Sequence, residues 1–218
     1  MKKQNPDIKY LFEPRSVAVV GASQNEEKIG HKILNNILSG GYAGSVYPIN
    51  PKGGKILDTK AYSSIEEVDD EVDMACIAIP AKYVFDAVKT CVDSGVKFIQ
   101  IITAGFSEVG NTEEEKKIID YARENGARVL GPNILGVFSA AVSLNATFGP
   151  QDVLQGNVAI ISQSGALGIS LMGKTVVENI RLSAFLSIGN KADLDEADLL
   201  EYLMNHDETK VIMMYMEG

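Results

Sequence analysis

The chain of 218 residues is 45 % hydrophobic and 22 % charged, a composition typical of globular proteins that excludes intrinsic disorder. Its 29 acidic and 20 basic side chains give a net charge of −9, which argues against nonspecific binding to nucleic acid. No apolar run approaches the ~18 residues of a membrane span, and the segment from Met1 to Asp7 lacks the apolar region of a signal peptide. We therefore expect a cytoplasmic protein that does not contact a membrane.

Short apolar runs alternate with amphipathic segments along the first part of the chain. The runs are rich in Val and Ile, which favours strands buried on both faces of a parallel sheet over buried helices. The segments between them place apolar residues on one stripe of a helix. This alternation predicts an α/β fold with a doubly wound parallel sheet. The predicted strands are Val17–Val20, Val46–Ile49, Met74–Ile79, Phe98–Ile102 and Arg128–Leu130, and the stripes are Ile29, Ile33, Ile37 and Leu38, then Val84, Val88, Cys91 and Val92, then Ile118, Ile119 and Ala122.

The alternation breaks between Gly136 and Asn157, where no period persists and Gly, Pro and Asn punctuate the chain. We interpret residues 137–157 as a linker with one irregular strand at most, between a Rossmann-like domain over residues 1–136 and a second α/β domain over residues 158–218. Gly218 directly follows an apolar strand that has no covering helix, so we expect the second domain to be truncated. Its predicted strands are Val158–Ile161, Leu182–Ile188 and Val211–Met216.

The segment GASQNEEKIG joins the first predicted strand to a helix. Gly21 allows a tight turn, and the free N–H groups of a helix start can bind an anion. Gly21 and Gly30 are nine residues apart, so the segment lacks the G-x-G-x-x-G fingerprint of dinucleotide sites. The second strand runs into NPKGGK at residues 50–55, with lysines where an NAD site needs a carboxylate. Lysines suit the extra phosphate of NADP or coenzyme A, but they also suit a solvated turn, and the spacing leaves both interpretations open.

Small or polar residues follow three further strands of the predicted sheet. Ligands of open parallel sheets bind at the carboxyl edge, so three successive strand ends of this kind predict a cleft there. Pro80 and Asn133 also have structural explanations, as the start of a helix and as a turn residue. The residues at these strand ends are Pro80, then Thr103, Ala104 and Gly105, then Asn133.

In the second unit, the segment SQSG at residues 162–165 ends a strand and starts a helix. Its hydroxyl and N–H groups suit either a phosphate seat or a plain N-cap. Ser162 stands where the G-x-S-x-G motif of serine hydrolases needs Gly, which argues against that class.

The cysteines and histidines of the chain carry no functional pattern. Cys76 and Cys91 lack metal-ligand spacing and lie in apolar segments, so we expect buried reduced thiols and no metal site. His31 falls in the first predicted helix and His206 at the end of a later one. Both positions have structural explanations, which we adopt.

In chain order, these motifs resemble the nucleoside-diphosphate-forming acyl-CoA synthetases, relatives of the succinyl-CoA synthetase α subunit. The resemblance covers nearly the whole chain. The stretch SIGNKADLD, where succinyl-CoA synthetases carry a SIGGDP-type sequence, is more similar to the ADP-forming acetyl- or acyl-CoA synthetase branch. The matching segments are FEPRSVAVVGAS (12–23), YPINPK (47–52), AIPA (78–81), TAGFSE (103–108), LGPNILG (130–136), ISQSGALG (161–168) and SIGNKADLDEADLLEYL (187–203).

The resemblance implies a CoA-binding domain followed by a flavodoxin-like domain, and it implies roles for individual residues. One group would hold the phosphates of coenzyme A, a second would line its adenosine and pantetheine path, and a third would seat the acyl phosphate and a phosphohistidine. The phosphate group is Gly21, Ala22, Ser23 and Lys52. The group along the adenosine and pantetheine path is Pro80, Thr103, Ala104 and Gly105, with Asn133 near the thiol. The seat of the acyl phosphate is Ser162, Gln163, Ser164 and Gly165, with Glu217 steadying the phosphohistidine.

The family's phospho-acceptor histidine would lie beyond residue 218, and neither His31 nor His206 matches it. The ATP-grasp part, which handles ATP or ADP and Mg, is also absent from this sequence. The resemblance therefore implies the CoA-binding portion of a ligase that interconverts acyl-CoA, ADP and phosphate with acid, coenzyme A and ATP. We expect it to need an ATP-grasp domain or β subunit, to be oligomeric in the full enzyme, and to be inactive alone.

Two alternatives come from other functional classes. The chain could be a CoA-binding regulatory or sensor module of an acetyltransferase-fused relative, and the residues after Gly218 would distinguish that role. An NADP-dependent oxidoreductase is disfavoured by the missing fingerprint and by the lack of a catalytic residue in the predicted cleft. The sequence does not identify the acid.

Overall fold

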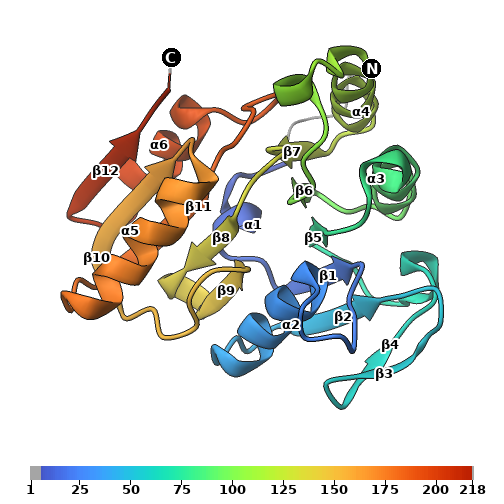
Figure 1. Ribbon diagram of the computed structural model, residues 1–218, viewed down its shortest axis with the longest axis horizontal. Coiled ribbons are helices and arrows are strands. Elements are labelled where there is room, and N and C mark those ends of the chain that lie inside the picture. The colour runs from blue at the N-terminus through green and yellow to red at the C-terminus, as the bar shows by residue number, and fades with distance from the viewer. Residues whose placement is uncertain (1–5, 218) are drawn as a thin grey trace.

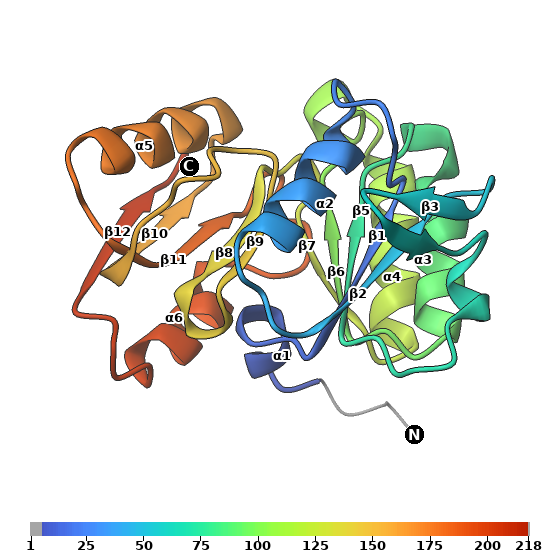
Figure 2. The same ribbon diagram turned by 90° about the horizontal axis from the view of Figure 1, so that it is seen from below.

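The computed structural model describes residues 6–217, which form two α/β halves side by side (Figures 1 and 2). The first half contains a five-stranded parallel sheet with the order β2-β1-β5-β6-β7. It confirms the predicted parallel sheet, and the strand positions agree with the apolar runs. The strands are β1 (Ser16–Val20), β2 (Ser45–Ile49), β5 (Met74–Ile77), β6 (Phe98–Ile101) and β7 (Arg128–Leu130).

Helices cover both faces of this sheet, as a doubly wound fold requires. Helix α2 (Ile29–Ser39) packs on the face toward the second half, whereas α3 (Val84–Asp93) and α4 (Thr112–Glu124) pack on the other face. The predicted stripes of α3 and α4 are fully buried. Within residues 6–217, no helix is both long and apolar enough to cross a membrane.

The buried stripe of α2 differs from the prediction. Ile33 and Ile37 are buried, but Ile29 is 42 % exposed and Leu38 is 39 % exposed. The helix packs against the first sheet and against a strand of the second half, and its buried arc runs through Gly30 and Leu34 instead. Long-range packing, which a local period does not encode, rotates the buried face.

Several short elements complete the first half. The loop after β2 contains a small antiparallel hairpin, and 3-10 turns precede α3 and α4. These elements are α1 (Lys9–Phe12), β3 (Gly54–Ile56), β4 (Thr59–Ala61) and the 3-10 helices Ile65–Glu67, Ala81–Tyr83 and Ser107–Val109.

The second half contains a five-stranded sheet with the order β12-β10-β11-β8-β9. Three strands are parallel, as predicted, and an antiparallel pair, β8 and β9, extends the sheet beside β11. The elements are β8 (Gly136–Ser139), the 3-10 helix Ala140–Val142, β9 (Leu144–Thr147), β10 (Gln155–Ser162), α5 (Gly165–Val177), β11 (Leu182–Ser187), α6 (Glu196–Met204) and β12 (Val211–Tyr215).

The prediction of a linker with one irregular strand is wrong for residues 137–147, where the chain forms two strands, β8 and β9. Each strand has four residues, too few to establish a period in the sequence. Ser143 adopts the left-handed conformation, with φ of 54°, and turns the chain between them. Strand β8 pairs on one side with β9 and on the other with β11, which is distant in the sequence.

The two halves share a hydrophobic core. One cluster of buried side chains includes Val19 of β1, Leu144 of β9 and Leu186 of β11. The buried Asn36 amide of α2 donates hydrogen bonds to the carbonyl oxygens of Thr147 (2.9 Å) and Gly149 (3.0 Å). Packing of α2 and β9 therefore sets the placement of the halves.

The cysteines agree with the sequence-based expectation. Cys76 and Cys91 are both buried and free. Burial raises the pKa of each thiol to about 12, so neither is ionised at neutral pH. Both pack as small core residues, and Cys76 Sγ also accepts a hydrogen bond from the Gln100 amide.

Candidate functional site

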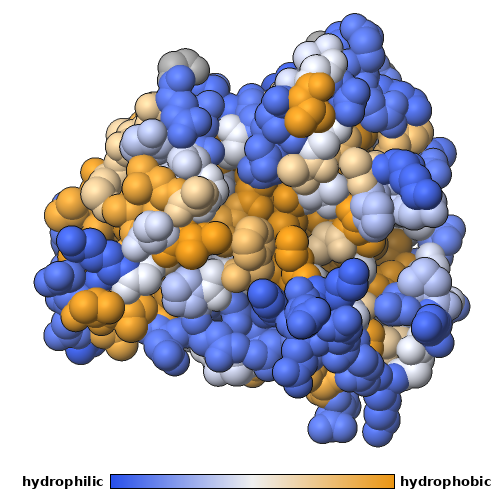
Figure 3. Space-filling model, in the orientation of Figure 1, coloured by the Kyte–Doolittle hydropathy of each residue, from blue (hydrophilic) through white to orange (hydrophobic). Residues whose placement is uncertain are grey.

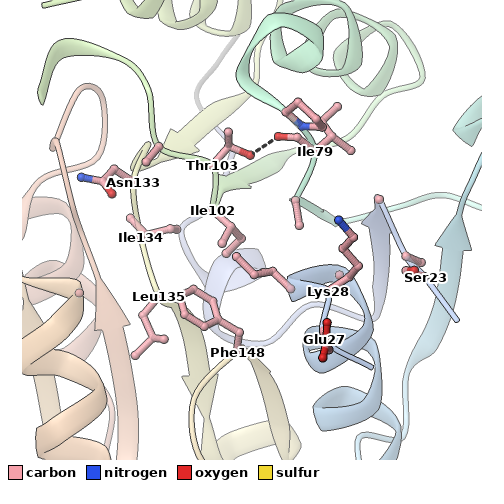
Figure 4. A pocket seen from close by; sticks show the side chains of 18 of the residues that line it. Ser23, Glu27, Lys28, Ile79, Ile102, Thr103, Asn133, Ile134, Leu135 and Phe148 are labelled. Carbon is pink, nitrogen blue, oxygen red and sulfur yellow. Dashed lines mark hydrogen bonds between the residues drawn. The ribbon is translucent and has the colours of Figure 1, made fainter. Parts of the chain in front are cut away.

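A cleft of about 1010 Å³ lies at the carboxyl edge of the first sheet, between the start of α2 and the start of α5 (Figure 4). The strand order of the sheet reverses at this point. Strand β2 lies on one side of β1, and β5, which comes later in the chain, lies on its other side. Apolar side chains gather in the hollow between the two halves (Figure 3). The structure brings eight of the predicted site residues to this cleft: Gly21, Ala22, Ser23, Pro80, Thr103, Ala104, Asn133 and Gly165.

The turn after β1 brings α2 against the sheet edge through two glycines. Gly21 has φ of +94°, and a Cβ atom there would lie 2.4 Å from the carbonyl oxygen of Ala78. A Cβ atom on Gly30 would lie 2.0 Å from the carbonyl oxygen of Gly21. The start of α2 therefore sits directly on the turn, and no side chain caps it. An uncapped helix N-terminus beside a cleft suits an anion.

The carbonyl groups of this turn are held by polar side chains. The Asn50 amide, at the end of β2, donates to the Ala22 carbonyl oxygen at 2.8 Å. His31 Nδ1 lies 2.8 Å from the Ser23 carbonyl oxygen. Both side chains therefore shape the turn, and this contact of His31 agrees with its structural interpretation.

Lys28 is the lysine that lines the cleft, and the sequence reasoning missed it. It occupies the N-cap position of α2, and its side chain points toward the loop after β5 (Figure 4). Lys52 is exposed in the turn after β2 and is not among the described residues that line the cleft, although Asn50 and Pro51 are. In the sequence, Lys28 lies two residues before Gly30, and this spacing could have pointed to Lys28 as a residue at the start of the helix.

The middle of the cleft is apolar and its far end is polar. Ile102, Ile134, Leu135 and Phe148 form the apolar walls. At the far end, the Thr103 hydroxyl donates to the Ile79 carbonyl oxygen at 2.7 Å, and Asn133 follows β7. Gly105 is not among the described residues that line the cleft, and its N–H donates to the Glu108 carboxylate. The cleft thus combines a helix start that suits an anion with an apolar path.

A second pocket of about 500 Å³ opens behind the Gly21 turn. It shares Gly21 and Pro80 with the main cleft, and Ser64 and Tyr83 line its other side. Its surface is mostly apolar with a few hydroxyl groups, which suits a flat heterocycle. The two cavities meet at the ridge formed by Gly21 and Pro80.

At the start of α5, the hydroxyl groups of both serines bond to the local backbone, and Ser164 is the N-cap. The Ser164 hydroxyl accepts a hydrogen bond from the Leu167 N–H, and the Ser162 hydroxyl donates to the Ser164 carbonyl oxygen. Gly165 and Ala166 face the cleft, whereas Ser162, Gln163 and Ser164 are not among the described residues that line it.

Glu217 and His206 lie at opposite ends of β12. The Glu217 N–H donates to Gln163 Oε1 at 2.9 Å, which places Glu217 near the start of α5 with an exposed side chain. His206 precedes β12, with Nδ1 2.9 Å from Thr209 Oγ1 and its ring stacked on Tyr202. The structural interpretation of His206 agrees with these contacts.

Comparisons with known proteins agree with this arrangement. The CoA binding domain family matches residues 15–140, and the succinyl-CoA ligase like flavodoxin domain family matches residues 155–218. The alpha subunit of acetate–CoA ligase (ADP-forming) I from Pyrococcus furiosus is 51 % identical over 217 residues, covering 97 % of this chain and 47 % of the relative. An ADP-forming acetate–CoA ligase from Methanocaldococcus jannaschii is 44 % identical, covering 97 % of this chain and 30 % of the relative.

Among solved structures, a dinucleotide-forming acetyl-coenzyme A synthetase 1 from Candidatus Korarchaeum cryptofilum, in complex with phosphate and ADP, is 53 % identical with a TM-score of 0.96. The match covers 97 % of this chain and 46 % of that chain. The chain therefore spans about half the length, or less, of these relatives. As its motifs predict, the chain is similar to the ADP-forming acyl-CoA synthetases. The match to the CoA binding domain family covers more than half of the chain, and the chain therefore belongs to that family.

Proposed function

We propose that this chain is the CoA-binding portion of an ADP-forming acyl-CoA synthetase, which interconverts acyl-CoA, ADP and phosphate with acid, coenzyme A and ATP. The observation that carries the proposal is the cleft itself. Its uncapped α2 start and Lys28 suit phosphate, and its apolar path leads toward the start of α5. The names of the relatives support acetate or a similar small acid as the substrate.

The residues fit the parts of coenzyme A. The turn at residues 21–23 and Lys28 would hold the phosphates, with Lys52 contributing from the adjacent exposed turn. The pocket behind Pro80 would take the adenine, and the path along Thr103 and Ala104 toward Asn133 would take the pantetheine arm. Coenzyme A supplies a thiol that accepts the acyl group. The chain's own groups bind the charged end and exclude water from the arm.

The remaining steps of the reaction would combine residues of this chain with groups outside residues 6–217. We propose that the start of α5, with Ser162, Gln163, Ser164 and Gly165, seats the acyl phosphate, and that Glu217 supports a phosphohistidine from another segment. His31 and His206 do not meet this need, because each ring is engaged in its own half. An ATP-grasp domain or β subunit would supply the ATP and Mg chemistry and an oligomeric assembly.

Calorimetric titration of the chain should show coenzyme A binding more tightly than 3′-dephospho-CoA, NADP or NAD. The lysines beside the cleft and the apolar arm path favour this order, because neither nicotinamide cofactor fills the path with a flexible arm. Equal affinity for coenzyme A and its dephospho form would remove the role of the lysines. Preference for NADP would favour the oxidoreductase alternative.

Lys28→Ala should weaken coenzyme A binding by ~1–3 kcal/mol, the range for losing a hydrogen bond to a charged group. Lys52→Ala should have a smaller effect, since Lys52 lies outside the cleft wall. Lys116→Ala is the matched control, because this exposed lysine of α4 pairs with Asp120 far from the cleft. Unchanged affinity in Lys28→Ala would place the phosphates elsewhere.

A further inference from the structure

The side chain of Asn190 joins three loops of the two halves. Asn190 belongs to the loop between β11 and α6 in the second half. Its amide nitrogen donates to Glu108 Oε2 at 2.6 Å and to Glu115 Oε2 at 2.7 Å, both from the first half. Its amide oxygen accepts from Asn133 Nδ2 at 3.3 Å, at the end of the cleft. One neutral amide therefore connects the second half to the loops after β6 and β7 and to the first turn of α4.

The two glutamates hold the backbone that follows the cleft-lining Thr103 and Ala104. The Glu108 carboxylate accepts hydrogen bonds from the N–H groups of Gly105 and Phe106. Glu115 Oε2 accepts from the Ser107 N–H at 3.2 Å and from its hydroxyl at 2.8 Å. Three successive amide groups thus bind two carboxylates, and both carboxylates bind Asn190.

The backbone around Asn190 leaves its side chain little freedom to withdraw. Its N–H donates to the Pro132 carbonyl oxygen at 3.0 Å, and the Ala192 N–H donates to the Gly131 carbonyl oxygen at 3.1 Å. Gly189 permits this approach, since a Cβ atom there would lie 2.3 Å from the Pro132 carbonyl oxygen. The loop of the second half therefore lies against the loop after β7.

Charge explains why a neutral amide suits this position. Burial acts to raise the pKa of Glu108, but hydrogen bonds from Asn190 and from the Gly105 N–H outweigh it, so the pKa lies below its usual value. Glu108 is thus ionised at neutral pH. The Asn190 amide offers two N–H donors, one for each glutamate, and adds no charge.

We propose that Asn190 is a positioning residue through which the second half holds residues 103–107 in the shape that binds coenzyme A. This inference rests on the proposed function of the cleft. Because the contact crosses between the halves, coenzyme A affinity depends on the docking of the second half as well as on the residues that line the cleft.

Asn190→Asp tests the proposal with almost no change in shape. A third carboxylate would face Glu108 and Glu115 and repel them at neutral pH. We expect faster hydrogen–deuterium exchange at the Gly105, Phe106 and Ser107 amides, and coenzyme A affinity about 10-fold weaker than wild type near pH 8. Toward about pH 5 one of the three carboxyl groups takes up a proton and can donate a hydrogen bond to another. The ratio of coenzyme A affinities of variant and wild type, measured at the same pH, should then return toward one.

Tyr202→Phe is the matched control. It removes another hydrogen bond between the halves, from the Tyr202 hydroxyl to Glu13 at 2.6 Å, without touching this loop. It should leave the exchange of residues 105–107 and coenzyme A affinity unchanged. Equal losses in both variants would indicate general loosening of the halves and overturn the proposal.

Asn190→Ser provides a second variant in case the aspartate variant does not fold. It removes the amide donors without adding charge, so it should weaken binding less and show no recovery at low pH. Wild-type affinity and exchange in the Asn190 variants, or a loss in Asn190→Asp that does not change with pH, would overturn the proposal. If the wild-type chain does not bind coenzyme A, the proposed function fails, while the exchange measurement still decides whether Asn190 holds the loop.

Discussion

Gly30→Ala should lower the free energy of unfolding by about 3 kcal/mol or more, at the upper end for overpacking, and should also weaken coenzyme A binding. The added Cβ atom would lie 2.0 Å from the Gly21 carbonyl oxygen and 2.7 Å from its carbonyl carbon. Both are backbone atoms of a tight turn, so they cannot yield as the end of a side chain would. Helix α2 would have to move off the turn, which separates the proposed phosphate seat from the cleft.

Gly173→Ala is the matched control for this substitution. Gly173 lies within α5, and a Cβ atom there would meet no atom within 4 Å. Alanine is the better helix former, so this variant should be as stable as wild type or more stable by up to ~1 kcal/mol. Urea unfolding and coenzyme A titration of both variants make the comparison. A Gly30→Ala variant as stable as Gly173→Ala would contradict the close packing of α2 on the turn.

Asp73→Asn should destabilise the fold by about 3 kcal/mol, because the substitution breaks a buried ionic network. The Asp73 side chain is fully buried and accepts hydrogen bonds from the Arg15 side chain at 2.9 Å and from Lys97 Nζ at 2.6 Å. The Arg15 N–H adds a further bond at 2.9 Å. Arg15 is 62 % exposed, so water compensates part of the loss and holds the cost near the lower end of the range for such pairs.

The effect of Asp73→Asn should depend on pH. Burial acts to raise the pKa of Asp73, but hydrogen bonds from Arg15 and Lys97 outweigh it and lower the pKa from 3.8 to about 2. Because the pKa is lower in the folded state, the carboxylate stabilises the fold fully above its unfolded pKa and loses this contribution as the pH falls toward 2. The difference in unfolding free energy between wild type and variant should therefore be constant near neutral pH and shrink below about pH 4.

Urea unfolding across this pH range, with Asp120→Asn as the control, checks the prediction. Asp120 pairs with Lys116 on the surface of α4, where its side chain is 51 % exposed. An exposed pair of this kind contributes little, so the control should change stability by less than about 1 kcal/mol. A difference for Asp73→Asn that persists unchanged below about pH 3 would show that the carboxylate charge is not what stabilises the fold.

The parallel strands and two of the large helices could be predicted from local sequence. Runs such as Val17–Val20 are too short and too apolar for amphipathic helices, and the stripe that ends at Val92 repeats with the helical period. Each signal depends only on residues close in the chain. For the same reason the strand ends at Pro80, Thr103 and Asn133 could be assigned to one edge of the sheet before their contacts were known.

The tertiary structure decided which of these residues meet, because contacts between distant segments leave no local period. Strand β8 pairs with the distant β11 and in turn with β9, and β9 packs against α2 and sets its buried face. Lys28 lies in the cleft because Gly30 lets α2 start against the Gly21 turn, whereas Lys52 stays outside it. The sequence by itself determined the class of fold and the strand ends that carry the site. The packing of α2 on the Gly21 turn decided which cation faces the cleft, and the docking of the two halves decided how Asn190 reaches its loop.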